Sequence, residues 1–286
     1  MISCKKTYTS ENCQRDYKAY ATSNLQKDPH NRRLIVTSIR SPISPKSTPK
    51  LRKIARNEGL EKIWLWTSVQ DLGHWLDQGF VLEGIVESHI DEKTLASLAY
   101  YIDQERGVSK NLEAEQKVLQ ELTKRPIKNL SPIPDAYEIR SLQRKDSFAI
   151  SGLLKEVFAS YPSPVENPSY IQELFSKGCL FAGVFHQGKL VSMAATYPER
   201  EWQGYEITDC ATHPEHRGLS LTERLIPELE KEIKESGPYC CYTLARATSF
   251  GINRVFYKLG YRFQGRLINN CHIAGDFEDM NLWVKP

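Results

Sequence analysis

The stretch DCATHPEHRGLSLT, residues 209–222, joins a predicted strand to a predicted helix and contains residues that could bind an anion. If the helix begins near Ser220, the amides of Gly218 to Thr222 precede its first intrahelical hydrogen bond and lie at the positive end of its dipole. Amides in this position bind phosphate groups, and the guanidinium of Arg217 would add positive charge. The stretch is therefore either a phosphate-binding turn or an ordinary turn.

Two acids, Glu206 and Asp209, lie on the strand that leads into this turn. Each is a candidate general base, because a carboxylate that faces a cleft can accept a proton from a reacting group. Burial can raise the pKa of a strand carboxyl toward neutrality for that task. Since side chains alternate along a strand, we expect only one of the two acids to face a cleft. The alternative for each is an ordinary solvent-facing strand residue.

The turn also resembles a known motif. Pro214 to Thr222, PEHRGLSLT, is similar to the pyrophosphate-binding segment of the GNAT acetyltransferases, an Arg or Gln followed by x-x-Gly-x-Gly or Ala. Ser220 replaces the usual middle Gly and Thr222 the usual Gly or Ala, so their hydroxyls either bind the phosphates or crowd them; Ser220 is also a good helix N-cap. The resemblance implies that acetyl-CoA is the co-substrate and that its diphosphate is held by Arg217, Gly218, Leu219, Ser220, Leu221 and Thr222.

The same resemblance implies roles for residues on the strand and the closing helix. Glu206 or Asp209 would deprotonate the amine, directly or through water. Tyr257 would protonate the leaving CoA thiolate, with core packing as its alternative, and Asn253 would contact the arm of the cofactor. Strand amides near Ala211 and Thr212 could polarise the thioester carbonyl.

Within that family the chain is most similar to the β-lysine N-acetyltransferase group. The resemblance rests on TDCAT, on TLARATSFGINRVFYKLGY and on the tail GRLINNCHIAGDFEDMNLW; it is strong over residues 137–286 and looser over 51–83. It implies acetylation of the side-chain amine of L-β-lysine to N6-acetyl-β-lysine. Such a product serves as a compatible solute in some organisms and as an intermediate of lysine degradation in others.

The polar tail fits such a substrate in its chemistry. β-Lysine carries two ammonium groups and a carboxylate, so its site needs acids near one end and amide or cationic donors near the other. Arg246 is a candidate clamp for the carboxylate, and the alternative for the tail is a solvated connection. The candidate substrate-binding residues are Arg246, Asn269, Asn270, Glu278 and Asn281, with Asp276 and Asp279 as further acids.

The elements that must position these residues follow a Pro-rich stretch at 125–136, which is the best candidate for a linker. We expect a catalytic domain at 137–286 with the GNAT fold. This is an α/β (α+β) architecture with a mixed, mostly antiparallel sheet and helices on both faces. The predicted strands are 137–140, 180–185, 189–196, 205–212, 239–245, 261–268 and 280–284, and the predicted helices are 145–157, 169–177, 220–236 and 252–259.

Residues 1–130 are expected to form an N-terminal α/β domain. Its predicted strands are 33–39, 62–67 and 80–88, and its predicted helices lie within 51–60, 69–78, 91–105 and 112–124. The segment WLDQGFVLEG, residues 75–84, lines up with FYKLGYRFQG, residues 256–265. This echo indicates either an old duplication, which would make the domain a degenerate half-GNAT, or the general similarity of Gly-capped helix ends. No Arg-x-x-Gly-x-Gly turn occurs in the domain, so we expect no cofactor site there.

The bulk composition disfavours several other classes. At 286 residues, with a net charge of +3 and 40% hydrophobic residues, the chain is ordinary for a globular protein and not basic enough to indicate nucleic acid. The absence of a membrane span or signal peptide favours a cytoplasmic protein. Neither the Cys nor the His spacing predicts a metal site, and Cys240 and Cys241 are expected in the core. The expected partner is a small-molecule amine, with no nucleic acid and no membrane; a homodimer is left open.

Two alternative functions remain at this point. A non-catalytic GNAT-like protein that binds acyl-CoA is motivated by Ser220 and Thr222. An acetyltransferase of protein lysines or N-termini would share the chemistry but needs an open substrate groove. We expect the N-terminal domain and the long tail to cover such a groove.

Overall fold

The computed structural model describes residues 25–39, 42–87, 94–127, 129–158, 161, 163–199, 202–235, 237, 239–273 and 275–286. In the C-terminal part the predicted elements are confirmed, except that the last two strands are longer. They are β6 (Tyr137–Ser141), α5 (Ser147–Val157), α6 (Pro168–Ser176), β7 (Leu180–His186), β8 (Lys189–Glu199), β9 (Gly204–Thr212), α7 (Leu221–Glu235), β10 (Cys240–Arg246), α8 (Phe250–Lys258), β11 (Arg262–Ile273) and β12 (Asp276–Lys285).

The N-terminal part contains β1 (Leu25–Asp28), β2 (Arg33–Ser38), α2 (Thr48–Asn57), β3 (Lys62–Ser68), α3 (Leu72–Leu76), β4 (Val81–Glu87), β5 (Thr94–Tyr101) and α4 (Leu112–Lys124). The prediction of a helix across 91–105 was wrong, because TLASLAYY forms β5. Ala and Leu favour helices, but this run is apolar on both sides and pairs with β3 on one edge and β4 on the other. Tertiary pairing overrides a weak local preference in such a run.

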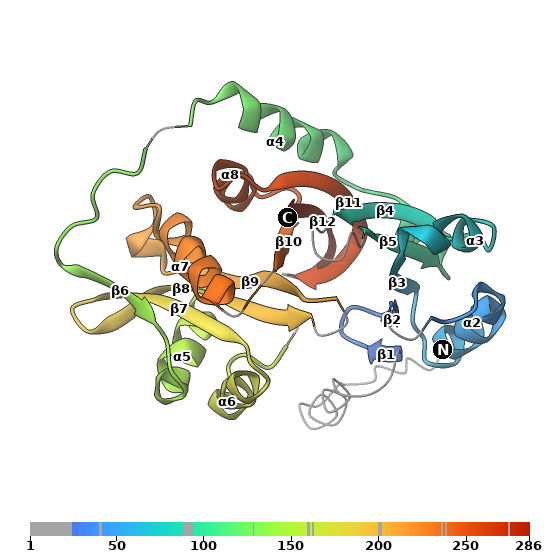
Figure 1. The fold of residues 1–286 in the computed structure, drawn as a ribbon, viewed down its shortest axis with the longest axis horizontal. Helices are drawn as coiled ribbons and strands as arrows, with labels where there is room; N and C mark the ends of the chain where they lie inside the picture. The colour runs from blue at the N-terminus through green and yellow to red at the C-terminus, as the bar shows by residue number, and fades with distance from the viewer. Residues whose placement is uncertain are drawn as a thin grey trace, which may run out of the picture.

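The twelve strands of the described residues form one sheet with the order β1-β2-β3-β5-β4-β11-β12-β10-β9-β8-β7-β6. The pairs β2–β3 and β9–β10 are parallel and the other pairs are antiparallel, which confirms the mixed, mostly antiparallel sheet. The sheet runs without a break through β4 and β11, so the division into two domains stays a prediction. The segment 125–136 has no helix or strand among its described residues, and it follows the edge of the molecule between α4 and β6 (Figure 1).

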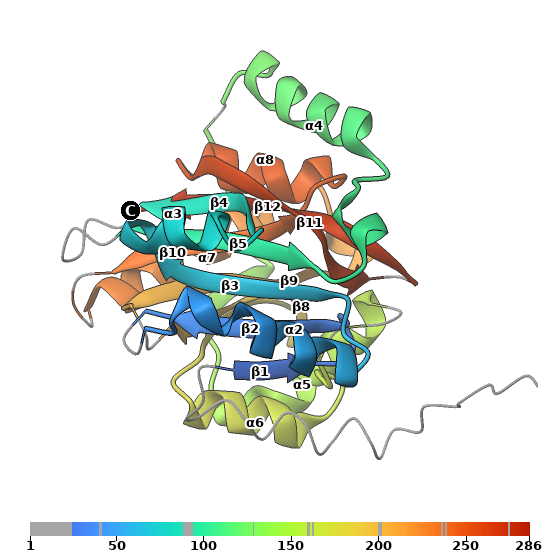
Figure 2. The same ribbon diagram turned by 90° about the vertical axis from the view of Figure 1, so that its right-hand side faces the viewer.

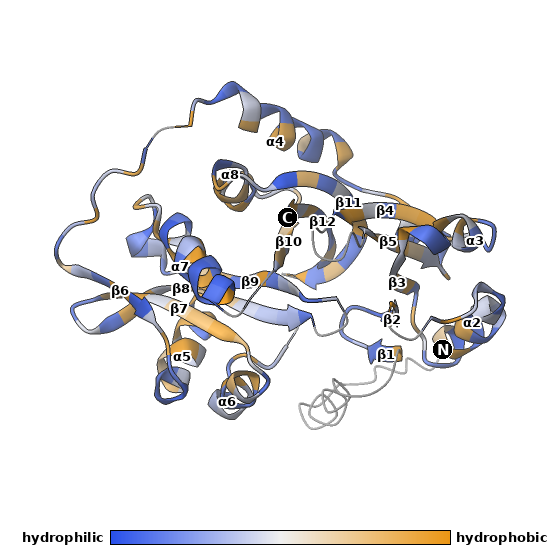
Figure 3. Cartoon of the chain, viewed as in Figure 1, coloured by the Kyte–Doolittle hydropathy of each residue, from blue (hydrophilic) through white to orange (hydrophobic). Residues whose placement is uncertain are grey.

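Helices cover both faces of the C-terminal strands, as expected. α5 and α6 bury Ile150, Leu154 and Ile171 against one face, whereas α7 and α8 bury Ile226 and Phe256 against the other. Each helix is amphipathic, so its apolar stripe packs on the sheet and its polar side faces outward (Figure 3). Of the described helices, none is long and apolar enough to cross a bilayer. Cys240 and Cys241 are both 0% exposed in the core, as predicted.

The two parts of the sheet repeat one arrangement of strands. In the C-terminal part the order β8-β9-β10-β12-β11 has α7 between β9 and β10 and α8 between β10 and β11 along the chain. In the N-terminal part β1-β2-β3-β5-β4 has α2 and α3 at the corresponding places, and the parallel pair recurs at β2–β3. α2 and α3 cover the outer face of these strands (Figure 2). Glycine-capped helix ends do not by themselves produce a shared strand order, so the topology favours the duplication.

The two parts meet where β4 pairs with β11 through Gly84 and Gly265, the last residues of the two echoing segments. A Cβ atom on Gly265 would lie 2.1 Å from the carbonyl oxygen of Glu83 and 2.4 Å from the Cα of Gly84. The backbones can approach this closely only because neither residue has a side chain.

Beyond this junction the sheet curls, so that β3 comes to face β10 (Figure 1). Trp64 and Trp66 of β3 share one core cluster with Tyr242 of β10 and Trp202, and the rings of Trp66 and Tyr242 are 5.8 Å apart. The inner surface of the curl is therefore built by both parts of the chain. We call this surface, with its Trp64, Trp66, Trp202 and Tyr242 side chains, the inner face.

Candidate active site

The turn between β9 and α7 has the geometry of an anion site. β9 ends at Thr212 and α7 begins at Leu221. Within the described chain, no hydrogen bond engages the backbone amides of Gly218 to Thr222. Arg217 beside them is exposed, with its Nε 3.3 Å from the carbonyl oxygen of Thr212. Free amides at the start of a 15-residue helix attract a phosphate.

Ser220 stands where a glycine is usual, and it adopts the glycine conformation. Its φ is 54°, and that of Gly218 is 85°. A left-handed residue other than glycine costs roughly 1–2 kcal/mol, so the substitution is strained but keeps the shape of the turn. This is not the extended backbone of an N-cap residue. The hydroxyl of Thr222 lies 3.3 Å from that of Thr212, which in turn is 2.8 Å from the hydroxyl of Ser192.

The parallel strands β9 and β10 separate next to this turn. They pair only from Gly204 opposite Cys240 to Glu206 opposite Tyr242. Further along, β9 carries a bulge at Asp209, whose φ is 49°. The bulge shifts the register with β8, and beyond Glu206 no described residue of β9 pairs with β10.

The bulge also overturns the expectation that Glu206 and Asp209 lie on opposite faces. Thr208 is opposite Ala195 but Ala211 is opposite Met193, so one extra residue resets the alternation. Asp209 contacts Tyr197, which packs with the core under α5 and α6, and its charge raises the pKa of Glu206. Ile207 packs against the other face. Both carboxyls therefore lie on the side away from α7.

Glu206 has the environment of a general base. It is half-buried at the point where β9 and β10 separate, next to Tyr242 on the inner face. Burial and the negative charges of Glu199 and Asp209 raise the pKa of Glu206 to about 8, although Arg33 and a hydrogen bond from Tyr242 oppose the shift. A carboxyl with a pKa near neutrality can accept a proton and release it again.

Asp209 is less suited to accept a proton, although burial raises its pKa as well. Its Oδ1 accepts a hydrogen bond from the hydroxyl of Tyr161, and its Oδ2 accepts one from that of Tyr197 at 2.6 Å. Both oxygens are therefore occupied, and Asp209 braces the bulge to the loop after α5.

Tyr257 lies on α8, half-buried, with its ring 6.5 Å from that of Trp283 and the guanidinium of Arg254 above it. Its role as an acid stays a prediction. Asn253 is 0% exposed, and its amide nitrogen donates to the carbonyl oxygens of Arg246 and Ser249. Its Oδ1 also accepts two hydrogen bonds, so the side chain fastens α8 to the sheet, and this placement gives no support to a cofactor contact.

The polar tail is a β hairpin rather than a solvated connection. Most of its polar side chains are buried: Asn269, Asn270, Asp279 and Asn281 are at most 4% exposed. Asn269 donates to the carbonyl oxygens of Arg106 and Val108, and Asn281 bonds Asn253 and Arg266. Binding of substrate by these residues stays a prediction, but the side-chain amides of Asn269 and Asn281 already have partners within the protein.

Arg246 and Glu278 form an ion pair at the far end of β10, and the Nε of Arg246 lies 2.6 Å from Glu278 Oε2. Arg246 is therefore matched by an acid of the same hairpin, which weakens the case for it as a carboxylate clamp. Asp276 forms an exposed ion pair with Lys110.

Sequence patterns missed the residues that surround the two carboxyls. Arg33, Tyr161, Glu199 and Tyr242 come from four separate segments, and only the curl of the sheet and the strand register bring them to Glu206 or Asp209. No spacing in the chain signals such a gathering. The single available hint was Tyr242, because it lies directly opposite Glu206 once β9 and β10 are taken as parallel.

The prediction that there is no metal site stays untested. His213, Glu215 and His216, in the short turn before Arg217, place one potential ligand atom each within 4.8 Å of one another. The hydroxyl of Tyr137 and Nδ1 of His216 are 2.9 Å apart. Burial and the neighbouring His186 lower the pKa of His216.

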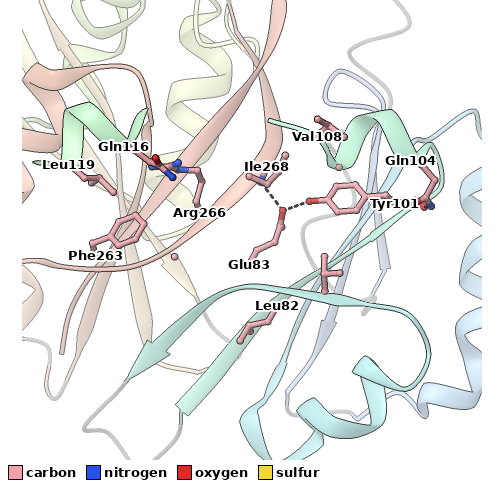
Figure 4. Close-up of a pocket in the computed structure, with 13 residues that line it drawn as sticks. Leu82, Glu83, Tyr101, Gln104, Val108, Gln116, Leu119, Phe263, Arg266 and Ile268 are labelled. Atoms are coloured by element: carbon pink, nitrogen blue, oxygen red, sulfur yellow. Dashed lines mark hydrogen bonds between the residues drawn. The ribbon is translucent and has the colours of Figure 1, made fainter. Parts of the chain in front are cut away.

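A cavity of about 820 Å³ lies elsewhere, under α4 beside the β4–β11 junction. Figure 4 shows Glu83 at its centre, where the carboxylate accepts hydrogen bonds from the Tyr101 hydroxyl and the Ile268 amide. The lining residues include neither the turn nor Glu206, Asp209 or Tyr257, so the chemistry described here does not belong to this cavity.

Comparison with known proteins identifies the family. Residues 138–263 match the family described as "Acetyltransferase (GNAT) domain". Over 264 residues the chain is 33% identical to N-acetyltransferase YodP of Bacillus subtilis, which covers 92% of this chain and 96% of that protein. The chain belongs to the GNAT acetyltransferases.

This GNAT acetyltransferase has further relatives. It is 31% identical over 256 residues to a beta-lysine N(6)-acetyltransferase of Methanosarcina mazei, covering 82% of this chain and 94% of that protein. Among solved structures, a putative acetyltransferase from Salmonella typhimurium with acetyl-CoA as its cofactor aligns with a TM-score of 0.46 and 16% identity. That alignment covers 53% of this chain and 94% of that one.

As a GNAT acetyltransferase the protein is an enzyme, which decides against the non-catalytic alternative. In the described structure a turn of free amides, the place where β9 and β10 stop pairing and the half-buried carboxyl of Glu206 lie next to one another along β9.

Proposed function

We propose that the protein transfers the acetyl group of acetyl-CoA to the terminal N6 amine of L-β-lysine, giving N6-acetyl-β-lysine. The observation that carries the proposal is Glu206, a half-buried carboxyl with a pKa of about 8 beside a turn of free amides. The Methanosarcina mazei relative, named beta-lysine N(6)-acetyltransferase, supports the choice of acceptor.

The diphosphate of acetyl-CoA binds the amides of Gly218 to Thr222 and the guanidinium of Arg217. The thioester arm lies between β9 and β10. His213 donates its backbone N–H to Val191 on β8, so alternation along β9 turns the Thr212 amide toward the gap. That amide is the better placed of Ala211 and Thr212 to polarise the thioester carbonyl.

In the reaction, Glu206 takes a proton from the N6 ammonium and the freed lone pair attacks the thioester carbonyl. The C–N bond forms, and as the C–S bond breaks the thiolate of CoA takes a proton from Tyr257. The second proton that the nitrogen must lose to become an amide passes to the Tyr257 phenolate, directly or through water, and Glu206 releases its proton to solvent after the products leave. Asp209 holds the bulge on which this geometry depends. Direct transfer from acetyl-CoA to the amine requires no covalent enzyme intermediate.

The test is release of free CoA thiol with β-lysine, α-lysine, ornithine and a lysine-containing peptide as separate acceptors. We expect the highest kcat/KM for β-lysine. Faster transfer to the peptide than to any free amino acid would contradict the proposal and favour a protein acetyltransferase.

A further inference from the structure

We propose that Tyr242 and Glu199 form a relay that carries the proton of Glu206 to solvent after each acetyl transfer. This inference rests on the proposed function, since it concerns the general base of the same reaction. Tyr242 and Glu199 contact neither the acceptor nor the cofactor in this proposal, and they act through Glu206.

The reaction leaves Glu206 with a proton that it must lose before the next turnover. A protonated carboxyl cannot act as a general base again, so its deprotonation is part of every cycle. Burial is the largest cause of the raised pKa of Glu206, followed by the charges of Glu199 and Asp209. The carboxyl therefore has poor access to water, and a route through other protein groups would ease the loss of its proton.

The hydroxyl of Tyr242 bridges two carboxyls. Tyr242 lies directly opposite Glu206 in the parallel pair of β9 and β10, and its hydroxyl makes a hydrogen bond with that carboxyl. The same hydroxyl lies 2.7 Å from Oε1 of Glu199, the last residue of β8. β8 and β10 are the two neighbours of β9 in the sheet, so the hydroxyl connects side chains from three adjacent strands.

One hydroxyl hydrogen cannot serve two carboxylates. A tyrosine hydroxyl donates a single hydrogen bond, but its oxygen can also accept one. When Glu206 is protonated, it donates to the oxygen of Tyr242, and Tyr242 donates to Glu199. The chain of hydrogen bonds is therefore complete when the two carboxyls hold one proton between them.

This chain has the direction that a proton relay needs. The proton of Glu206 passes to the oxygen of Tyr242 while the hydroxyl proton of Tyr242 passes to Glu199. One O–H bond forms and one breaks at Tyr242, which stays neutral, and the negative charge moves from Glu199 to Glu206. Glu199 is only half-buried at the end of its strand, so it can then give the proton to water.

The ring of Tyr242 is held in one position. It is 1% exposed, and its centroid lies 5.8 Å from that of Trp66 and 5.5 Å from that of Trp202. A ring packed in this way keeps its hydroxyl between the two carboxyls. The inner face therefore aligns the relay through side chains from both parts of the chain.

The other charged groups that act on Glu206 are less suited to receive its proton. Both oxygens of Asp209 already accept hydrogen bonds from tyrosine hydroxyls, and Arg33 is a cation that accepts none. Among the described residues that influence Glu206, Glu199 is thus the carboxylate best placed to take the proton.

The first test is Tyr242→Phe, which keeps the ring between the two tryptophans and removes the hydroxyl. In weak buffer at pH 7, we expect kcat with β-lysine to fall by roughly tenfold or more. The value of kcat/KM above about pH 8, where Glu206 is ionised, should change little, because the relay acts after the products leave. Added imidazole, a small base that can take the proton directly, should restore kcat of the variant and leave that of the wild type unchanged.

Glu199→Gln separates the relay from a purely electrostatic role. Removal of the negative charge favours the ionised form of Glu206, so a Glu199 that acts only through its charge predicts an unchanged or higher kcat at pH 7. The relay predicts a lower kcat that imidazole restores, since an amide cannot carry the proton onward.

Tyr261→Phe is the matched control. The hydroxyl of Tyr261 donates to Oε1 of Glu230 at 2.8 Å, and the residue is 2% exposed in the core under α7 and α8. This variant loses the same kind of buried hydrogen bond away from Glu206, so its kcat should not depend on imidazole.

An unchanged kcat in Tyr242→Phe, or a loss that imidazole does not restore, would overturn the proposal. Glu199 is half-buried, so Glu199→Gln decides the matter even where Tyr242→Phe fails to fold. A wild-type enzyme inactive with every amine would instead contradict the proposed function.

Discussion

The pH dependence of the reaction is the sharpest test of the role given to Glu206. Burial first, and then the charges of Glu199 and Asp209, raise the pKa of this carboxyl from its usual 4.5 to about 8. At pH 7 roughly one tenth of the enzyme then carries the ionised base. We expect log kcat/KM to rise with a slope near 1 up to about pH 8 and then to level off.

The assay is thiol release at subsaturating β-lysine between pH 6 and pH 9. An alkyl ammonium with a pKa near about 10 stays protonated through this range, so the break belongs to the enzyme. The kcat/KM of Glu206→Gln should fall by roughly 10²- to 10⁴-fold, and its pH profile should no longer level off near pH 8. Glu199→Gln removes one of the charges that raise the pKa, so its break should move to lower pH.

The same group links stability to pH. The pKa of Glu206 is about 8 in the folded protein and about 4.5 in the unfolded chain. Between these two pH values the folded protein holds a proton on Glu206 that the unfolded chain has lost. The free energy of unfolding therefore falls as the pH rises from about 4.5 to about 8. Glu206→Gln cannot ionise, so its Tm should exceed that of wild type increasingly from pH 5 to pH 8.5. The whole pKa shift of Glu206 corresponds to a loss of at most about 5 kcal/mol in the free energy of unfolding. If the profile of log kcat/KM against pH still levels off near pH 8 in Glu206→Gln, Glu206 is not the general base.

Four further outcomes are expected. Tyr257→Phe keeps the ring against Trp283 but removes the proton donor, so kcat should fall by roughly 10- to 100-fold, with Tm unchanged in a thermal scan. Ser220→Gly should keep or improve acetyl-CoA affinity in calorimetry, because glycine adopts a φ of 54° without strain; a large loss of affinity would show that the hydroxyl binds the phosphate. Gly265→Ala should destabilise the protein by roughly 3 kcal/mol or more in urea unfolding, because its Cβ would collide with the Glu83 carbonyl oxygen at 2.1 Å. Calorimetry should also give one acetyl-CoA per chain, and two equivalent sites would contradict the account of the N-terminal part.

Local patterns in the sequence were enough to predict the turn and most elements. The turn at 217–222 is recognisable as a candidate anion site because glycine, arginine and a helix start are neighbours along the chain. The helices have clear apolar stripes, and the echo between 75–84 and 256–265 pointed to a repeated arrangement that the strand order reproduces.

Features that depend on contacts between segments far apart in the sequence could not be predicted from local patterns. The strand β5 has helix-favouring residues and is a strand only because β3 and β4 flank it. The bulge at Asp209 has no sequence signal, yet it puts both acids on one side. The tail was predicted to bind substrate, with a solvated connection as the alternative. Its burial as a hairpin could not be predicted, because its asparagines find partners on other segments, such as the carbonyl oxygen of Arg106 on the N-terminal part.

The repeated strand order bears on which residues each half of the chain can carry at corresponding positions. Arg33 and Gly204 occupy corresponding positions, each at the start of the first strand of its parallel pair. A side chain at 204 would run into the indole of Trp202, which lies 2.3 Å from the place of its Cβ. Two identical subunits with this arrangement would need the same residue at both places, and no single choice could serve both. Covalent fusion removes that constraint, so one copy can carry the cation while the other keeps the close contact.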